Sequence, residues 1–224
     1  GVDNQPNQMF VADLMFMTSE GAILARPAST VRAGEERWVA RRLTDIGIPI
    51  LRSVRGNGVF EGADAAWLNP GMVILGKGFR TNAEGAAQVA AVLKELGAEV
   101  FVTDLPRGSM HLMGILRFAD HDLAIAWPDR LAPSAVDVIK ANGYDLHFIP
   151  DTREATTGFA LNFVTLGPRK ILMPAGNPRA QAYFDSLGIK CHTVDVSELR
   201  KAAGAIGCLT GIVNISLTAN ICGK

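Results

Sequence analysis

A thiol, an imidazole and a carboxylate occupy similar places in three repeated segments of this 224-residue chain: Cys208, His111 and Glu61. Each is expected at the start of a strand in a different unit, and equivalent positions in a pseudo-symmetric ring converge near its axis. Only the thiolate attacks a carbon centre, so Cys208 needs a base or cation such as His111 nearby. An imidazole oriented by Glu61 can also protonate a leaving amine and then deprotonate a water. The set predicts nucleophilic hydrolysis, although a lone cysteine after a glycine is commonly a small buried hydrophobe.

The remaining cysteines and histidines do not follow a metal-binding pattern. Cys191 and Cys222 form no CxxC pair, and the four histidines form no HExxH cluster. Three cysteines are also too few and too widely spaced for a disulfide framework. We therefore expect chemistry that uses no metal and no other cofactor.

The elements that must position these residues recur in the order strand, strand, helix, strand, at a period of about 50 residues. The expected helices cover residues 33–46, 84–96, 133–141 and 178–187, and each is followed by a glycine that ends it. The expected strands cover residues 9–17, 22–26 and 48–51; 65–68, 72–75 and 99–102; 111–118, 123–127 and 146–149; and 159–166, 170–173 and 189–196. Residues 207–213 are expected to begin a fifth unit.

Repeats of this kind predict an α/β protein built as a five-bladed β/α propeller, with ββαβ units around a pseudo-fivefold axis and one blade incomplete. A closed ring leaves no open sheet edge, so the missing elements are expected from residues before Gly1. The prediction treats residues 1–224 as a single domain. The alternative is an open α/β layer with irregular spacing.

Composition limits the partners. The 22 basic and 22 acidic residues leave a formal charge of zero, and 48% of the residues are hydrophobic. This balance argues against a general polyanion binder. No apolar run is long enough to span a bilayer, and the first residues lack the pattern of a secretory signal. We expect a cytoplasmic protein with no nucleic-acid or membrane partner, and homo-oligomers remain possible.

Four motifs resemble the guanidine-modifying superfamily: FEGAD at 60–64, GFRTNAEG at 78–85, MHL at 110–112 and GC at 207–208. This superfamily comprises five-bladed β/α propellers such as arginine deiminase, dimethylargininase and amidinotransferase. The motifs occur in the family's order over residues 7–213, which is nearly the whole chain.

The resemblance implies a role for each member of the set. Cys208 attacks the guanidinium carbon, His111 acts as general acid and base, and Glu61 holds the substrate nitrogens. An amine leaves, and water hydrolyses the thiouronium that remains on the cysteine.

The resemblance also implies residues that bind the substrate. Arg32 and Arg80 match two arginines that hold the α-carboxylate, for which a bidentate guanidinium is suited. The alternative for both is an exposed charge at a helix start. Asp64 supports the site through hydrogen bonds, and Asp13 lies in the first-unit loop where the family has polar substrate contacts.

Two positions depart from the deiminase pattern. Asn7 and Met113 stand where deiminases have aspartates that grip the guanidinium, and each missing charge-assisted hydrogen bond costs about 1–3 kcal/mol. An asparagine donates and accepts, so it can also hold a neutral ureido group. This feature favours the arginine dihydrolases, which are often fused to an ornithine-processing domain.

The sequence thus predicts a hydrolase of L-arginine that releases ammonia with ornithine or citrulline. Its partner would be a small guanidino or ureido amino acid, and a fused ornithine-processing domain is possible. The alternatives are an amidinotransferase, a hydrolase of a modified guanidine such as methylated arginine, and a non-catalytic binding protein of the same fold.

Overall fold

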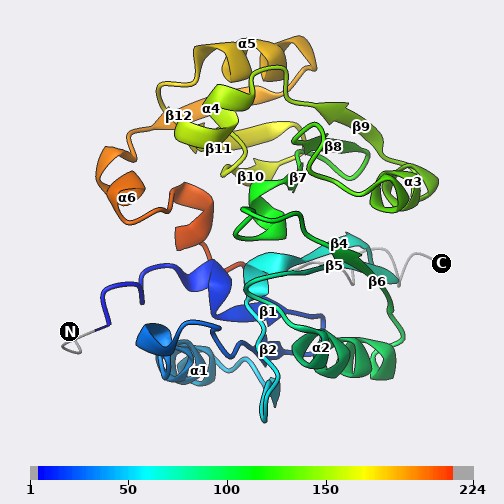
Figure 1. Ribbon diagram of the computed structural model, residues 1–224, viewed down its shortest axis with the longest axis vertical. Coiled ribbons are helices and arrows are strands. Elements are labelled where there is room, and N and C mark those ends of the chain that lie inside the picture. The colour runs from blue at the N-terminus through cyan, green and yellow to red at the C-terminus, as the bar shows by residue number, and fades with distance from the viewer. Residues whose placement is uncertain (1–4, 214–224) are drawn as a thin grey trace.

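A computed structural model describes residues 5–213, which form four three-stranded sheets that follow one another along the chain (Figure 1). Within each sheet the first two strands are antiparallel and the second and third are parallel. The strands are β1 Met15–Met17, β2 Ala22–Leu24 and β3 Ile50–Ser53; β4 Ala65–Asn69, β5 Met72–Lys77 and β6 Glu99–Asp104; β7 Leu116–Phe118, β8 Leu123–Ala126 and β9 Asp145–Phe148; and β10 Val164–Gly167, β11 Lys170–Pro174 and β12 Lys190–Val194. The predicted strand–strand–helix–strand order is therefore confirmed for four units.

Each parallel pair is joined by a helix, as a parallel connection requires. These crossover helices are α1 Glu36–Asp45, α2 Ala83–Glu95, α3 Pro133–Ala141 and α5 Pro178–Ser186, and they lie at the periphery (Figure 1). A glycine with φ between 76 and 87° follows each of them, at positions 47, 97, 143 and 188. Two short helices were not predicted, α4 Thr152–Thr157 and α6 Ser197–Lys201.

Short 3₁₀ helices replace the first half of several predicted strands. They are η1 Val11–Asp13, η4 Leu112–Gly114 and η5 Ile206–Leu209, while η2 Thr30–Arg32 precedes α1 and η3 Gly62–Asp64 precedes β4. The predicted strands at 9–17 and 111–118 therefore begin only at Met15 and Leu116, and the strand predicted at 159–166 begins at Val164, after a turn. These predictions were wrong in part because a buried turn and a buried strand both appear as a continuous apolar run.

The prediction of a strand at 207–213 was also wrong. The backbone there turns, with the Thr210 N–H donating to the Gly207 carbonyl at 3.2 Å, and residues 210–213 form no regular strand. Cys222 and any continuation of a fifth unit lie outside the described residues. The five-bladed ring stays a prediction.

The hydrophobic core is shared between neighbouring units. Residues of the first and second sheets pack together around Phe60, the second and third meet around Leu112, and the third and fourth meet around Phe163. The 3₁₀ helices also touch across the units: η1 contacts η3 and η5, and η3 contacts η4. Over residues 5–213, the helices are too short and too polar to cross a bilayer.

Candidate active site

The 3₁₀ helices position the predicted catalytic side chains. Glu61 and His111 are the extended residues immediately before η3 and η4, Asp13 is the last residue of η1, and Cys208 lies within η5. Because these short helices contact one another near the middle of the molecule, residues separated by 48 to 195 positions meet there (Figure 1).

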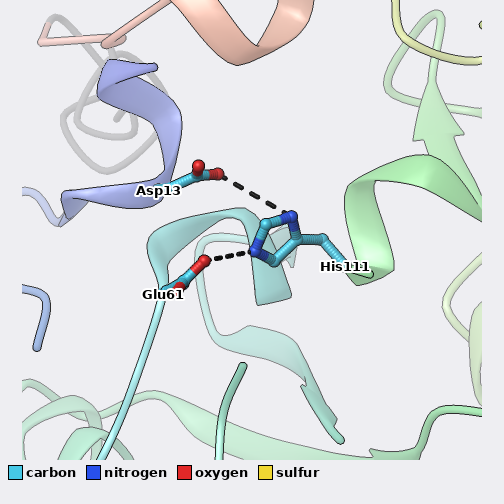
Figure 2. A group of neighbouring side chains, drawn as sticks. All are labelled: Asp13, Glu61 and His111. Atoms are coloured by element: carbon cyan, nitrogen blue, oxygen red, sulfur yellow. Dashed lines mark hydrogen bonds and ion pairs between the residues drawn. The ribbon is translucent and has the colours of Figure 1, made fainter. Parts of the chain in front are cut away.

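His111 lies between two carboxylates that come from different elements (Figure 2). Its Nε2 is 2.6 Å from Glu61 Oε2, and its Nδ1 is 3.8 Å from Asp13 Oδ1. All three side chains are buried, with Glu61 fully enclosed. Two carboxylates facing the two ring nitrogens favour the imidazolium, which carries a proton on each nitrogen.

Burial and neighbouring charges shift the pKa values of His111 and Glu61 in opposite directions. Burial alone lowers the pKa of His111, but the hydrogen bond to Glu61 and the carboxylates of Asp13 and Asp64 outweigh it and raise the pKa. Burial alone raises the pKa of Glu61, whereas His111, Arg80 and the Ala28 N–H lower it on balance. The site therefore holds a carboxylate against a protonated imidazole.

Asp64 links the segment that carries Glu61 to the segment that carries His111. Its Oδ1 accepts the Leu112 N–H at 3.0 Å, and its Oδ2 accepts the Thr81 hydroxyl at 2.6 Å. The Thr81 oxygen in turn accepts the Glu61 N–H at 3.3 Å. Burial raises the pKa of Asp64 to about 6, against the opposing effect of His111. Through Thr81, Asp64 thus ties the residue after His111 to the backbone of Glu61.

Asn162 holds the segment that carries Cys208. Its Oδ1 accepts the Gly207 N–H at 2.8 Å and the Cys208 N–H at 3.3 Å, and its Nδ2 donates to the Cys208 sulfur at 3.1 Å. Burial raises the pKa of the thiol, and Asn162 and the Arg117 guanidinium partly offset that rise. Cys208 and His111 both line a cavity of about 240 Å³.

Arg117 approaches this segment from β7. Its Nη2 donates to the Phe163 carbonyl, and its guanidinium lies 5.3 Å from the centre of the Phe163 ring. Burial lowers the pKa of Arg117 to about 10, and its Nε has no hydrogen-bond partner in the structure. Among residues 5–213 no carboxylate pairs with it, so Cys208 is the acidic group that interacts with its charge.

Arg32 is placed differently from the expectation. Its Nη1 is 2.6 Å from Asp13, its Nε is 2.7 Å from Glu35, and its Nη2 donates to the Asn7 carbonyl at 3.3 Å. Only 5% of Arg32 is exposed. It is neither an exposed helix-start charge nor open to a substrate carboxylate, because Asp13 and Glu35 already occupy its donors.

The structure also shows the surroundings of Arg80 and of Asn7 and Met113, the two residues that depart from the deiminase pattern. Arg80 is 3.5 Å from Glu61 Oε1 and is 26% exposed at its side chain, so it borders the site. Asn7 contacts Arg32 through its backbone carbonyl. Met113 is buried and lines the cavity that Cys208 and His111 share, where it contributes an apolar surface.

Three polar residues of this site were missed from the sequence: Asn162, Arg117 and Glu35. None of the three stands in a recognisable motif. The partners of Asn162 and Arg117 are identified only by the fold, and Cys208 lies 46 positions from Asn162 in the sequence. Glu35 had a local signal, since it lies three positions after Arg32 just before a helix.

Two groups of side chains place atoms that can bind a cation close together. Asp13, Glu61 and His111 present atoms that lie within 4.8 Å of one another, as do Asp120, His121 and Asp122 in the turn between β7 and β8. The first group is buried and equally suited to a guanidinium. The second is partly exposed, and Arg169 pairs with Asp120 and Asp122.

Comparison with known proteins places this geometry in context. The family model for arginine deiminase matches residues 2–148. The chain is 29% identical over 205 residues to an N(G),N(G)-dimethylarginine dimethylaminohydrolase of Pseudomonas aeruginosa, covering 92% of this chain and 76% of the relative. It is 31% identical over 139 residues to an arginine deiminase of Rhodococcus opacus, covering 57% of this chain and 33% of that one.

Solved structures show the same fold. A variant of the Pseudomonas aeruginosa dimethylaminohydrolase in complex with citrulline superposes with a TM-score of 0.79 at 27% identity, over 92% of this chain and 76% of that one. The product-bound N-terminal domain of ArgZ, a cyanobacterial arginine dihydrolase, superposes with a TM-score of 0.83 at 22% identity, over 96% and 78% of the two chains.

Proposed function

Because the chain belongs to the arginine deiminase family, we propose that it cleaves a guanidino C–N bond through a covalent intermediate on Cys208. It is a hydrolase of C–N bonds. The observation that carries the proposal is a buried carboxylate oxygen, Asp13 Oδ1, which has no hydrogen-bond partner and faces the His111 imidazole. A buried acceptor left unpaired is costly, and a guanidinium N–H would satisfy it.

The proposed reaction uses the proton on His111. The Cys208 thiol first loses its proton to solvent, the thiolate attacks the guanidino carbon, and the amine leaves with a proton from the imidazolium. The neutral imidazole then takes a proton from water, which attacks the thiouronium carbon and releases the thiol and a ureido product. Glu61 and Asp13 support the positive charge, with Glu61 fixing the orientation of the ring through its 2.6 Å hydrogen bond.

The candidate substrates differ in the amine that leaves. Arginine and water yield citrulline and ammonia, and a second hydrolysis of citrulline would yield ornithine, ammonia and carbon dioxide. A dimethylated arginine would yield citrulline and dimethylamine. The chain is 29% identical to the dimethylaminohydrolase over 92% of its length and 22% identical to ArgZ over 96%, which favours a modified guanidine as the second candidate, alongside the arginine dihydrolase reaction.

We also propose that the site lies on the axis of a five-bladed β/α propeller within one domain, with η5 opening the fifth blade. The support is that η5 contacts η1 in the way that η3 contacts η4.

The test is to incubate the protein separately with L-arginine, L-citrulline and asymmetric dimethylarginine and to quantify ammonia, dimethylamine, citrulline and ornithine. The matched control is Cys191→Ser, which removes another free thiol, beside Cys208→Ser. We expect turnover of at least one substrate, abolished only by Cys208→Ser. Turnover that survives Cys208→Ser, or no turnover of any substrate by a folded chain, would reject the mechanism.

A further inference from the structure

A second and larger cavity, of about 550 Å³, shares Met113 with the cavity that contains Cys208. Parts of β1, β4, β7 and β10 line it; these are the first strands of the four sheets and lie toward the middle of the molecule (Figure 1). We call it the central cavity. Gly207 lines the central cavity and its neighbour Cys208 lines the other, so the two meet at the segment that carries the thiol. The proposed reaction makes no use of the central cavity.

The walls of the central cavity are mainly apolar. Their largest side chains are Met15, Phe16, Met17, Trp67, Met113 and Phe118. Methionine side chains are unbranched and adapt to ligands of irregular shape. The cavity volume falls within the roughly 300–1,000 Å³ that is usual for sites that bind small organic molecules. Such walls favour a ligand with an apolar portion, because its burial removes apolar surface from water.

One cation in this lining has no acidic side chain as a partner. Arg117 lies on β7, and among residues 5–213 no carboxylate pairs with its guanidinium and its Nε has no hydrogen-bond partner. Its Nη2 donates to the Phe163 carbonyl, and its guanidinium lies over the Phe163 ring. A guanidinium has five N–H donors, and its charge is costly to hold in an apolar environment without a counter-charge. The central cavity therefore presents a positive charge that an anion would compensate.

The acidic residue in the lining, Asp120, is paired elsewhere. Its Oδ1 lies 2.8 Å from His121 Nδ1, and its Oδ2 lies 3.4 Å from Arg169 Nε. Asp120 is thus engaged by other groups and does not neutralise Arg117. Apolar walls with one uncompensated guanidinium suit a carboxylate that carries an apolar chain, because a carboxylate can pair with a guanidinium through two parallel hydrogen bonds.

We propose that the central cavity binds an aliphatic monocarboxylate, with the carboxylate at Arg117 and the chain against the apolar walls that include Met17 and Trp67. This site is separate from the cavity of Cys208 and His111, and its occupation requires no turnover of a guanidino compound.

A ligand at Arg117 should also affect the thiol. The Arg117 guanidinium favours the Cys208 thiolate through its charge. A carboxylate bound to Arg117 offsets that charge, so the pKa of Cys208 should rise and the thiol should react more slowly with alkylating reagents. By linkage, ionisation of Cys208 should weaken the binding of the carboxylate to the same extent. The central cavity would thus regulate the reactivity of the nucleophile.

The first experiment locates the ligand with ω-bromooctanoate, whose bromine quenches tryptophan fluorescence on contact. Trp67 lines the central cavity, whereas Trp127 lines the cavity of Cys208. In the full chain with Trp67 as its sole tryptophan (Trp38→Phe, Trp127→Phe), quenching should saturate as the ligand is added. In the chain that keeps only Trp127 (Trp38→Phe, Trp67→Phe), it should not saturate. Saturable quenching of Trp127, or none of Trp67, overturns the proposal.

The second experiment tests the charge in the chain that keeps only Trp67. Arg117→Met should raise the dissociation constant of ω-bromooctanoate by about tenfold, as expected for the loss of one charge-assisted contact, and Arg117→Lys should recover part of the loss. The control is Arg107→Met, which removes an exposed arginine outside the lining. The neutral ω-bromooctanol should bind the parent and Arg117→Met alike. An unchanged constant for ω-bromooctanoate in Arg117→Met, or an equal rise in Arg107→Met, overturns the proposal.

The third experiment tests the coupling to the thiol. At a fixed pH, saturating octanoate should slow the alkylation of Cys208 by iodoacetamide by about twofold or more, as expected for a partly screened charge. Mass spectrometry of the Cys208 peptide follows the rate, with the Cys191 peptide as internal reference. Octanoate should not slow the reaction in Arg117→Met. An unchanged rate in the parent, or slowing that persists in Arg117→Met, rejects the coupling. None of these measurements needs turnover, so they decide this site even if the proposed function fails.

Discussion

At the scale of single residues, the site holds a thiol whose proton is not easily lost. Burial raises the pKa of Cys208, while the surrounding carboxylates raise the pKa of His111 and keep the imidazole charged. The thiol therefore keeps its proton to higher pH than a free cysteine does, and the imidazole keeps its proton to higher pH than a free histidine does. The groups that favour the thiolate are the backbone of Ala205, the Asn162 amide and the Arg117 guanidinium.

Removing the charge of Arg117 should make the thiol less acidic. In Arg117→Met the thiolate loses a nearby cation, so the pKa of Cys208 should rise further, by about one unit. The rate of Cys208 alkylation by iodoacetamide rises with pH as the thiolate forms, and the midpoint of this profile should move to higher pH. Arg107→Met is the control. A midpoint that stays in place would show that Arg117 does not act on the thiol.

At the scale of elements, tight turns rather than strands present the reactive groups. The first turn of η3 approaches β1 so closely that a Cβ on Gly62 would lie 1.9 Å from the Met15 carbonyl oxygen. In η4, the corresponding element of the next unit, a Cβ on Gly114 would meet nothing within 4 Å. Gly62 is the first residue of η3 and Gly114 is the last residue of η4, so the closely packed glycine and the open one occupy opposite ends of their turns.

This contrast yields a matched pair of variants. Gly62→Ala should lower the free energy of unfolding by about 2 kcal/mol or more, because backbone must move to relieve the clash. It should also reduce activity, because Gly62 follows Glu61 directly. Gly114→Ala should leave the stability within about 0.5 kcal/mol of the parent. Urea unfolding followed by circular dichroism measures both, and equal stability of the two variants would contradict the packing argument.

Local signals also explain what was missed at this scale. Asp151 caps α4 by accepting the Arg153 and Glu154 N–H groups at 2.8 and 3.1 Å, and Glu154 stands three positions later, which is the pattern of a helix start. The helix was therefore readable from sequence. The 3₁₀ helices were not, since no capping residue with a side-chain hydrogen bond marks any of them.

At the scale of the whole molecule, neighbouring units share their cores. Ala86 of α2 and Ile23 of the first sheet belong to one buried cluster, and Ile125 of the third sheet and Phe184 of α5 belong to another. No unit in the described chain can lose its structure without exposing apolar surface of the next. The molecule should therefore unfold as one cooperative system.

One tryptophan lies in each of the first three units, which allows a direct test. A variant that keeps only Trp38, with Trp67→Phe and Trp127→Phe, reports on the first unit through α1. A variant that keeps only Trp127, with Trp38→Phe and Trp67→Phe, reports on the third. For each, the fluorescence midpoint in urea should coincide with the midpoint from circular dichroism of the same variant. Separate midpoints would show that the units unfold independently.

The sequence by itself determined the order of elements in four units and the types of residue that carry the chemistry. Helical periodicity, helix-ending glycines and the Glu61, His111 and Cys208 motifs are local signals, so they can be read without the fold. The family prediction drawn from these motifs is confirmed by the match over residues 2–148.

Only the tertiary structure decided which partner each charge has. Arg32 pairs with Asp13, 19 positions away, and Asn162 reaches Cys208 across 46 positions. Packing of distant segments selects such contacts, because a buried charge must find a counter-charge or hydrogen bond wherever the fold brings one.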